Sequence, residues 1–207
     1  MTVTSISEMT KSRVRIEIDG EDSLVLYKGE LRIYGIKEGE DIARESYEQL
    51  VHEVLPKRAR LRAMNLLKGR NYTSFQLLNK LTTGGYSEKH AREAVDYVAS
   101  FGYIDDKQYT KDFIEYNKER KSKQRIFSDL QQKGISRQIL EEMWEEAVGE
   151  DMAELEKEQI RGWLQKKHFD AEQASPSDIR KMTGFLYRKG FSFDSIRSVL
   201  SLDITSI

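Results

Sequence analysis

Residues 13–34 show the alternation of apolar and polar side chains that is typical of half-buried β-strands. Val14, Ile16 and Ile18 alternate with charged residues, and further apolar runs at 24–27 and 31–34 follow turn signals at 19–22 and 28–29. Apolar residues spaced along 41–54 then predict a helix before Pro56. Because a three-stranded meander is marginal without a helix against it, we expect residues 1–56 to form a small β-meander plus a helix.

After Pro56 a second pattern occurs three times: a leucine, a glycine four positions later, an apolar residue and a serine. The leucine closes the apolar stripe of one helix, the glycine tolerates a left-handed backbone just past the helix end, and the serine caps the next helix. Each copy therefore predicts a helix, a tight turn and another helix. The three copies are Leu81…Gly85-Tyr86-Ser87, Leu130…Gly134-Ile135-Ser136 and Leu186…Gly190-Phe191-Ser192.

A further amphipathic helix precedes each pair, and start signals mark the boundaries: capping boxes at Thr73 and Asp105, and the pair Ser175-Pro176. Glycine-to-glycine spacings of about 50 residues are typical of helical arrays. We therefore predict a mainly α fold, in which three-helix repeats at 57–104, 105–149 and 150–207 follow the meander and helix of residues 1–56. Stacking of the repeats would give a curved, elongated solenoid, which we expect to be a monomer.

The composition narrows the class of protein. Hydrophobic residues make up 38% of the 207-residue chain and charged residues 33%, which favours helices with narrow apolar stripes. The chain has no cysteine, so disulfides, thiolate metal sites and cysteine nucleophiles are excluded. Neither a signal peptide nor an apolar run of membrane-spanning length is present. We expect a cytoplasmic protein with no membrane contact.

The net charge of −1 hides strongly sorted charges. Residues 57–70 carry bases and no acid, residues 118–137 are mostly basic, and residues 138–158 are mostly acidic. The bases are not matched by acids four positions away, so helix salt bridges do not account for them. Either these blocks are solvated helix faces, or they contact phosphate or an acidic protein surface. The predicted binding residues are Arg58, Arg60, Arg62, Lys68, Arg70, Lys118, Arg120, Lys121, Lys123 and Arg125.

The sequence offers little support for catalysis. The three histidines are far apart and have no metal-ligand spacing, and neither a phosphate-binding glycine loop nor a nucleophile elbow is present. Capping accounts for Asp105, and core spacing predicts that Tyr109, Phe113, Tyr116, Trp144 and Trp163 are packing residues. We expect no enzyme activity, no cofactor and no metal; a pocket with converging polar groups would revive the enzyme hypothesis.

Residues 59–135 resemble the RecX family. The residues that carry the resemblance are Leu66-Leu67…Arg70-Asn71-Tyr72-Thr73-Ser74…Leu77-Leu78…Leu81…Gly85-Tyr86-Ser87, Gly102-Tyr103-Ile104-Asp105-Asp106…Tyr109…Phe113…Arg120, and Arg125-Ile126…Leu130…Lys133-Gly134-Ile135. Ser122-Lys123 departs from the family, which often has a glycine there, and residues 150–207 match more loosely.

The resemblance implies a curved array of three-helix units that lies in the groove of a RecA–DNA filament. There it would reduce the ATPase, strand-exchange and co-protease activities of RecA, which places the chain in regulation of DNA repair, homologous recombination and the SOS response. The alternative from the basic blocks is a protein that binds single- or double-stranded DNA directly. Both alternatives stay open from the sequence.

Overall fold

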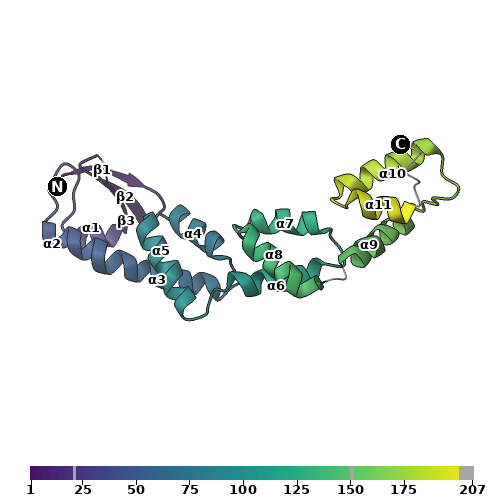
Figure 1. Cartoon of the computed structure of the whole chain (residues 1–207). Helices are drawn as coiled ribbons and strands as arrows, with labels where there is room; N and C mark the ends of the chain where they lie inside the picture. The colour runs from purple at the N-terminus through teal and green to yellow at the C-terminus, as the bar shows by residue number, and fades with distance from the viewer. Residues whose placement is uncertain (21, 150–151, 201–207) are drawn as a thin grey trace. The chain divides into compact units, whose positions relative to one another are not determined.

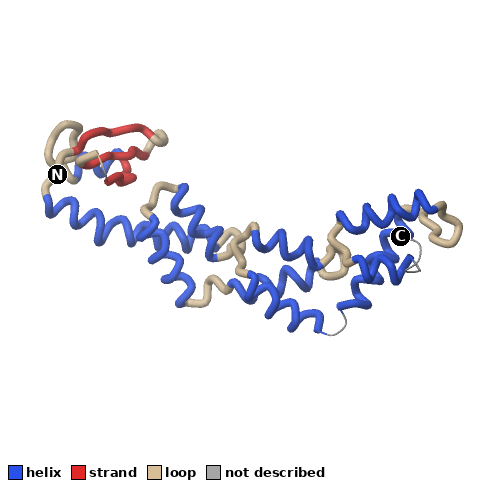
Figure 2. The backbone as a smooth tube through the Cα atoms, turned by 45° about the horizontal axis from the view of Figure 1, so that its top comes forward, coloured by secondary structure: helices blue, strands red, loops and turns tan. Residues whose placement is uncertain are grey.

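The computed structural model describes residues 1–20, 22–149 and 152–200. It is mainly helical, with a small three-stranded sheet at the N-terminus (Figures 1 and 2). The chain divides into two compact units, Met1–Asp105 and Asp106–Ile207.

An antiparallel meander begins the first unit. Its strands β1 (Val3–Glu8), β2 (Arg13–Ile18) and β3 (Asp22–Tyr27) pair in chain order. Val14 pairs with Leu26 and Ile16 with Leu24, so the apolar side chains of both strands lie on the same face. That face packs against Ile42, Leu50 and Leu55 in one hydrophobic cluster.

Two parts of this region differ from the prediction. Residues predicted as a third strand form the short helix α1 (Lys28–Ile33), and Ile33 is 76% exposed. The missing strand is β1, which the sequence did not reveal because its pairing with β2 is irregular between Val3 and Ser5. Such an irregularity breaks the alternation on which strand prediction depends.

A continuous helical path joins the sheet to the first three-helix module. Helix α2 (Arg44–Gln49) runs through a π-helical turn, Leu50–Val54, into α3 (Leu55–Leu67), and Val54 and Leu55 keep α-helical dihedral angles. Proline lacks an N–H and clashes with the carbonyl four residues back in a regular helix. The wider turn directly before Pro56 accommodates both constraints, so Pro56 lies inside the helical path and does not end it.

The first module combines α3 with α4 (Ser74–Thr83) and α5 (Glu88–Ser100). Thr73 and Ser87 cap α4 and α5 as predicted, and Gly85 between them has a φ of +95°. The turn lies against the sheet: Arg13 donates a hydrogen bond to the Gly84 carbonyl (2.8 Å), and a Cβ on Gly85 would lie 2.6 Å from Val25 Cγ2. The glycine therefore also permits close packing of the turn on β3.

The second unit holds α6 (Asp106–Asn117), α7 (Lys123–Gln131) and α8 (Arg137–Val148), followed by α9 (Met152–Lys166), α10 (Pro176–Arg188) and α11 (Phe193–Leu200). Ser136 and Ser175 are helix caps, as predicted, and Gly134 and Gly190 have positive φ angles. The α6–α8 and α9–α11 triplets each surround a separate hydrophobic cluster.

The turn at Gly190 connects these two triplets, as the turn at Gly85 connects the first module to the sheet. Ser122 Oγ donates to the Lys189 carbonyl (2.6 Å), and a Cβ on Gly190 would lie 2.8 Å from Ser122 Oγ. From α9, Gln159 donates to the carbonyls of Lys118 and Lys121. Turn glycines thus pack against an earlier part of the chain within both units.

Candidate partner-binding and nucleic-acid interface

Helix α3 and the loop after it carry the first basic block. Arg60, Arg62, Lys68 and Arg70 are all exposed, and none of them forms an ion pair with a carboxylate of the described residues. Their charge is therefore left uncompensated at the surface, and it can attract an anionic partner.

Arg58 differs from the other bases of this block. Its side chain is 17% exposed, forms an ion pair with Glu30, donates to the Val25 carbonyl (3.4 Å) and lies over the Tyr27 ring at 4.7 Å. These contacts tie α3 to β3 and α1. Arg58 thus has a structural role within the unit, which the sequence did not indicate.

The remaining bases of α3 point to different sides of the helix. Arg62 lies near Tyr86, whose hydroxyl pKa is raised by burial and lowered to a smaller extent by Arg58, Arg13 and Arg62. Arg60 lies over the ring of Tyr97 on α5, with its guanidinium carbon 5.1 Å from the ring centroid. The basic residues of α3 therefore lie on at least two faces of the module.

The second basic block is largely neutralised by carboxylates. Lys121 pairs with Asp129 (2.8 Å), and Arg125 pairs with the same carboxylate (3.1 Å) from four positions away. The expectation that no acid matches these bases at i,i+4 was therefore wrong for Arg125 and also for Arg137, which pairs with Glu141. Lys118 pairs with Glu115 (2.8 Å) and donates to the carbonyl of Ala147 at the end of α8 (3.0 Å).

Arg120 is the member of this block that keeps an uncompensated charge within the described chain. It is exposed and lies over the Tyr116 ring at 5.1 Å. Tyr116 is itself 71% exposed, so its prediction as a packing residue was wrong, whereas Trp144 is buried as predicted. Tyr109, Phe113 and Trp163 are partly buried against their clusters.

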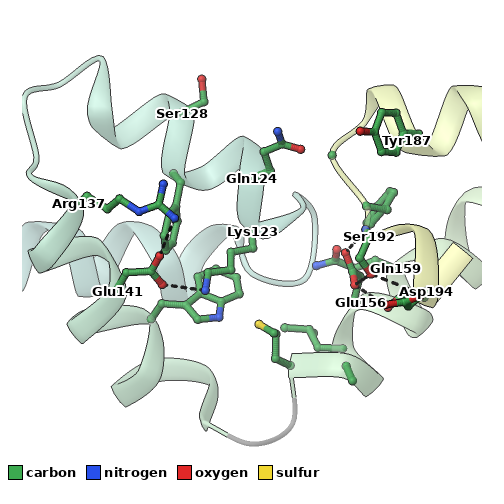
Figure 3. Close-up of a pocket in the computed structure, with 18 of the residues that line it drawn as sticks. Lys123, Gln124, Ser128, Arg137, Glu141, Glu156, Gln159, Tyr187, Ser192 and Asp194 are labelled. Atoms are coloured by element: carbon green, nitrogen blue, oxygen red, sulfur yellow. Dashed lines mark hydrogen bonds and ion pairs between the residues drawn. The ribbon is translucent and has the colours of Figure 1, made fainter.

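A cleft of about 900 Å³ lies between α7–α8 and α9–α11 in the second unit (Figure 3). On one wall Lys123 pairs with Glu141 (2.9 Å), which also pairs with Arg137 (3.2 Å). The hydrogen bond from Lys123 holds the pKa of Glu141 below its ordinary value, with smaller contributions from the charges of Lys123 and Arg137. The Lys123 ammonium also lies 5.6 Å from the Trp144 ring.

On the other wall the Glu156 carboxylate accepts three hydrogen bonds, from the backbone N–H of Ser192 (2.7 Å) and from the hydroxyls of Ser192 and Ser195 (both 2.6 Å). These bonds hold the start of α11 against α9. Lys123, Arg137 and Glu141 thus pair on one wall and Glu156 is hydrogen-bonded on the other, so these groups do not converge on a common point.

The surface of the first unit also carries exposed aromatic residues that were not among the predicted binding residues. Tyr97, Phe101 and Tyr103 are 36%, 61% and 59% exposed, and their rings follow one another beside Arg60. Among the described residues, no helix is both long and apolar enough to cross a membrane, and no three His, Asp or Glu side chains are grouped to hold a metal ion.

Comparison with known proteins identifies the family. The chain is 31% identical over 204 residues to the regulatory protein RecX of Caldanaerobacter subterraneus subsp. tengcongensis, covering 98% of this chain and all of that protein. The chain belongs to the RecX family. The regulatory protein RecX of Clostridium botulinum (strain Alaska E43) is 30% identical, covering 97% of this chain and 94% of that protein.

Two further findings agree with membership of the RecX family. The family model for the third three-helix domain of RecX matches residues 154–200, which span nearly all of α9 to α11. A crystal structure of regulatory protein RecX has the same fold, with a TM-score of 0.63 and 19% identity over 97% of this chain and 99% of that one. RecX from Lactobacillus salivarius gives a TM-score of 0.60 at 19% identity, over 72% of this chain and 96% of that one.

The named RecX relatives are regulatory proteins, so the comparisons support a regulatory role for this chain. The structure separates the residues that sequence patterns grouped together. Arg58, Lys118, Lys121, Lys123 and Arg125 each contact a carboxylate of their own unit. Within residues 1–20, 22–149 and 152–200, no ion pair is formed by Arg60, Arg62, Lys68, Arg70 or Arg120. The second group has the charge available for a partner.

Proposed function

We propose that this RecX family protein binds the RecA–DNA filament and lowers the ATPase, strand-exchange and co-protease activities of RecA. The observation that supports this most directly is the full-length similarity to proteins named as regulatory proteins RecX. The free cations of α3 and Arg120 add a physical reason, because uncompensated positive charge favours encounter with a filament that contains a polyanion.

The test is the ATPase rate of RecA on single-stranded DNA, measured with increasing amounts of this protein. We expect the rate to fall, and an unchanged rate at several-fold excess over filament subunits would contradict the proposal. Localisation of the protein in the cytoplasm, where RecA acts, is part of the same proposal.

Charge-reversal variants locate the surface that acts on RecA. Arg62→Glu/Lys68→Glu reverses two exposed bases of the α3 region, and Arg120→Glu reverses the free base of the second unit. The control Lys80→Glu/Lys89→Glu makes the same charge change as the double variant, at exposed residues of α4 and α5. We expect inhibition to weaken in the first two variants and to persist in the control. Equal inhibition in all of them would refute the assignment of these residues.

A second candidate function is direct binding of DNA. Four exposed bases without carboxylate partners, Arg60, Arg62, Lys68 and Arg70, lie within a short stretch of α3 and its loop. Each base that neutralises a phosphate releases counterions, so affinity should fall steeply as the salt concentration rises. Binding of DNA by the protein without RecA, measured at several salt concentrations, tests this candidate, and no binding even at low salt would exclude it.

A further inference from the structure

Three exposed aromatic rings form a continuous row on the first unit. The centroids of Tyr97 and Phe101 are 5.0 Å apart with their planes at 59°, and those of Phe101 and Tyr103 are 6.2 Å apart with their planes at 26°. Arg60 lies at the Tyr97 end of the row, 5.1 Å from that ring. Side chains from α3, α5 and the loop after α5 thus meet on one surface.

The hydrophobic core of the module does not account for these rings. The α5 residues in that core are at most 8% exposed, whereas Phe101 and Tyr103 are each more than half exposed; these core residues are Ala91, Ala94, Val95 and Val98. Apolar surface left in water forgoes about 25 cal/mol per Å² of stabilisation. A contiguous group of exposed apolar side chains is typical of a binding surface.

The backbone fixes the row in place. The N–H of Tyr103 donates to the Val98 carbonyl (3.0 Å), and Gly102, with a φ of +72°, lets the chain turn back along the end of α5. Tyr103 is therefore held beside Phe101 by the helix end itself. A surface that is ordered before binding loses less entropy when it binds.

The chemistry of the row matches single-stranded nucleic acid. Aromatic faces accept bases of any sequence by stacking, and a neighbouring arginine contacts the phosphates or stacks in turn. Arg60 has no carboxylate partner among the described residues, so its charge is available. The bases of a duplex are already stacked and paired, so the rings distinguish single strands from double strands.

We propose that Arg60, Tyr97, Phe101 and Tyr103 form a binding surface for single-stranded nucleic acid, on which bases stack on the rings and Arg60 contacts the phosphate backbone. This proposal rests on the second candidate function, direct binding of DNA, and names its site. Carbon atoms of stacked rings approach to about 3.5–4.0 Å, so a base inserted between two rings needs about 7 Å. The Phe101–Tyr103 separation of 6.2 Å is smaller, and bases therefore stack on the exposed outer faces.

Acidic residues next to the row of rings lower the expected affinity for nucleic acid. Asp96 precedes Tyr97 and Asp105 lies two residues beyond Tyr103, and both are exposed. Since their charge repels phosphate, binding through this surface should be weak at physiological salt and should be measured at low ionic strength.

The experiment measures the affinity of the full-length protein for a fluorescein-labelled oligo(dT) of about 15 nucleotides, a length within the range of single-strand binding sites. Phe101→Ala/Tyr103→Ala removes two rings that are not part of the core. Phe75→Ala is the matched control, because Phe75 is a 46% exposed aromatic residue of the same module outside the row. Circular dichroism confirms that each variant is folded.

We expect the double variant to bind oligo(dT) roughly tenfold or more weakly, the range that loss of base stacking gives. The salt dependence should stay the same, because the rings release no counterions, and Phe75→Ala should bind like the unmodified protein. The Phe101→Trp variant should retain binding. The fluorescence of the tryptophan introduced at position 101 should change when oligo(dT) binds. The unmodified protein should bind an abasic oligonucleotide of the same length about as weakly as the double variant binds oligo(dT).

The outcomes separate this proposal from the function on which it rests. If the unmodified protein fails to bind oligo(dT) at low salt, both direct DNA binding and the stacking surface are wrong. If it binds and the double variant binds equally well, DNA binding stands and the stacking surface is refuted. If the double variant loses only its effect on RecA, the row contacts protein, and the assignment to nucleic acid is likewise refuted.

Discussion

Replacement of Gly85 by alanine tests whether the first module is held on the sheet by the close approach of its turn. Two effects act on this residue. A left-handed backbone costs an L-residue about 1–2 kcal/mol, and Gly85 has a φ of +95°. In addition, the new Cβ would lie 2.6, 3.0 and 3.2 Å from the Cγ2, Cβ and Cγ1 atoms of Val25.

Val25 has little freedom to avoid this overlap. It is 8% exposed in strand β3, and a β-branched side chain is restricted at χ1. Overpacking of this kind costs about 1–3 kcal/mol. We therefore expect Gly85→Ala to lower the free energy of unfolding by about 2–5 kcal/mol in total.

Gly102→Ala is the matched control for the backbone effect. Its φ of +72° is also left-handed, but an added Cβ would meet no atom within 4 Å among the described residues. We expect a loss of only about 1–2 kcal/mol for this variant. Urea unfolding followed by circular dichroism measures all the variants under the same conditions.

A double-mutant cycle isolates the contact. Val25→Ala removes the overlapping methyl groups, so in the Gly85→Ala protein it should cost clearly less than in the unmodified protein, with a coupling of about 1 kcal/mol or more. Equal destabilisation by Gly85→Ala and Gly102→Ala, or additive effects of Gly85→Ala and Val25→Ala, would refute a stabilising close contact between Gly85 and Val25.

Three further predictions concern the Gly190 turn, the partly buried Arg58–Glu30 ion pair and the buried His90. Gly190→Ala should destabilise the second unit by about 2–4 kcal/mol, since Ser122 Oγ is held by its hydrogen bond to Lys189 and by capping α7; urea unfolding checks this, and a loss no larger than that of Gly102→Ala would contradict it. Arg58→Met should cost about 2 kcal/mol because it leaves the Glu30 carboxylate, 15% exposed, without its partner; adding Glu30→Gln should recover part of the loss in the same measurement, and no recovery would contradict the role of the charge. His90 is buried, and burial lowers its pKa below 6.5 despite a hydrogen bond to the backbone of Val51; its contribution to stability is therefore complete above pH 6.5 and is lost as the pH falls through the folded-state pKa. Unfolding free energies at pH 7.5 and 5.5 should thus differ less in His90→Gln than in the unmodified protein, and an equal difference would contradict this.

Most of the helical architecture could be predicted from the sequence because its signals are local. A glycine with positive φ and a serine that accepts a backbone N–H are decided within a few residues, and Gly85, Ser87, Gly134 and Ser136 behave as predicted. The division of residues 57–200 into repeats at 57–104, 105–149 and from 150 onward stays a prediction.

The N-terminal strands show where local patterns are insufficient. The alternation at Leu31 and Ile33 suggested a strand, but Glu30 accepts a hydrogen bond from the backbone N–H of Tyr27 (2.7 Å) and starts a short helix instead. Strand β1 was missed because its irregular pairing hides the alternation. Both outcomes depend on pairing and packing that the local pattern does not contain.

The binding residues could be predicted only as a set of candidates. Lys123 is neutralised by Glu141, 18 positions away, and Lys121 by Asp129, 8 positions away, so a search at helical spacing does not find these pairs. Similarly, Tyr97 and Phe101 follow each other at i,i+4, a spacing that core residues also show. The packing of α3 and α4 against α5 decides which side chains of α5 remain at the surface.

The Gly85 and Gly190 turns also bear on how such a chain can grow during evolution. In each case the later segment contributes a glycine without a side chain, and the earlier segment contributes the side chains that lie against it, Val25 or Ser122 and Gln124. A duplicated segment that contains its own turn glycine already has one of the two sides of this contact. Lineages could therefore gain or lose whole modules with few accompanying substitutions, provided that the preceding segment keeps a surface on which the glycine turn can pack closely.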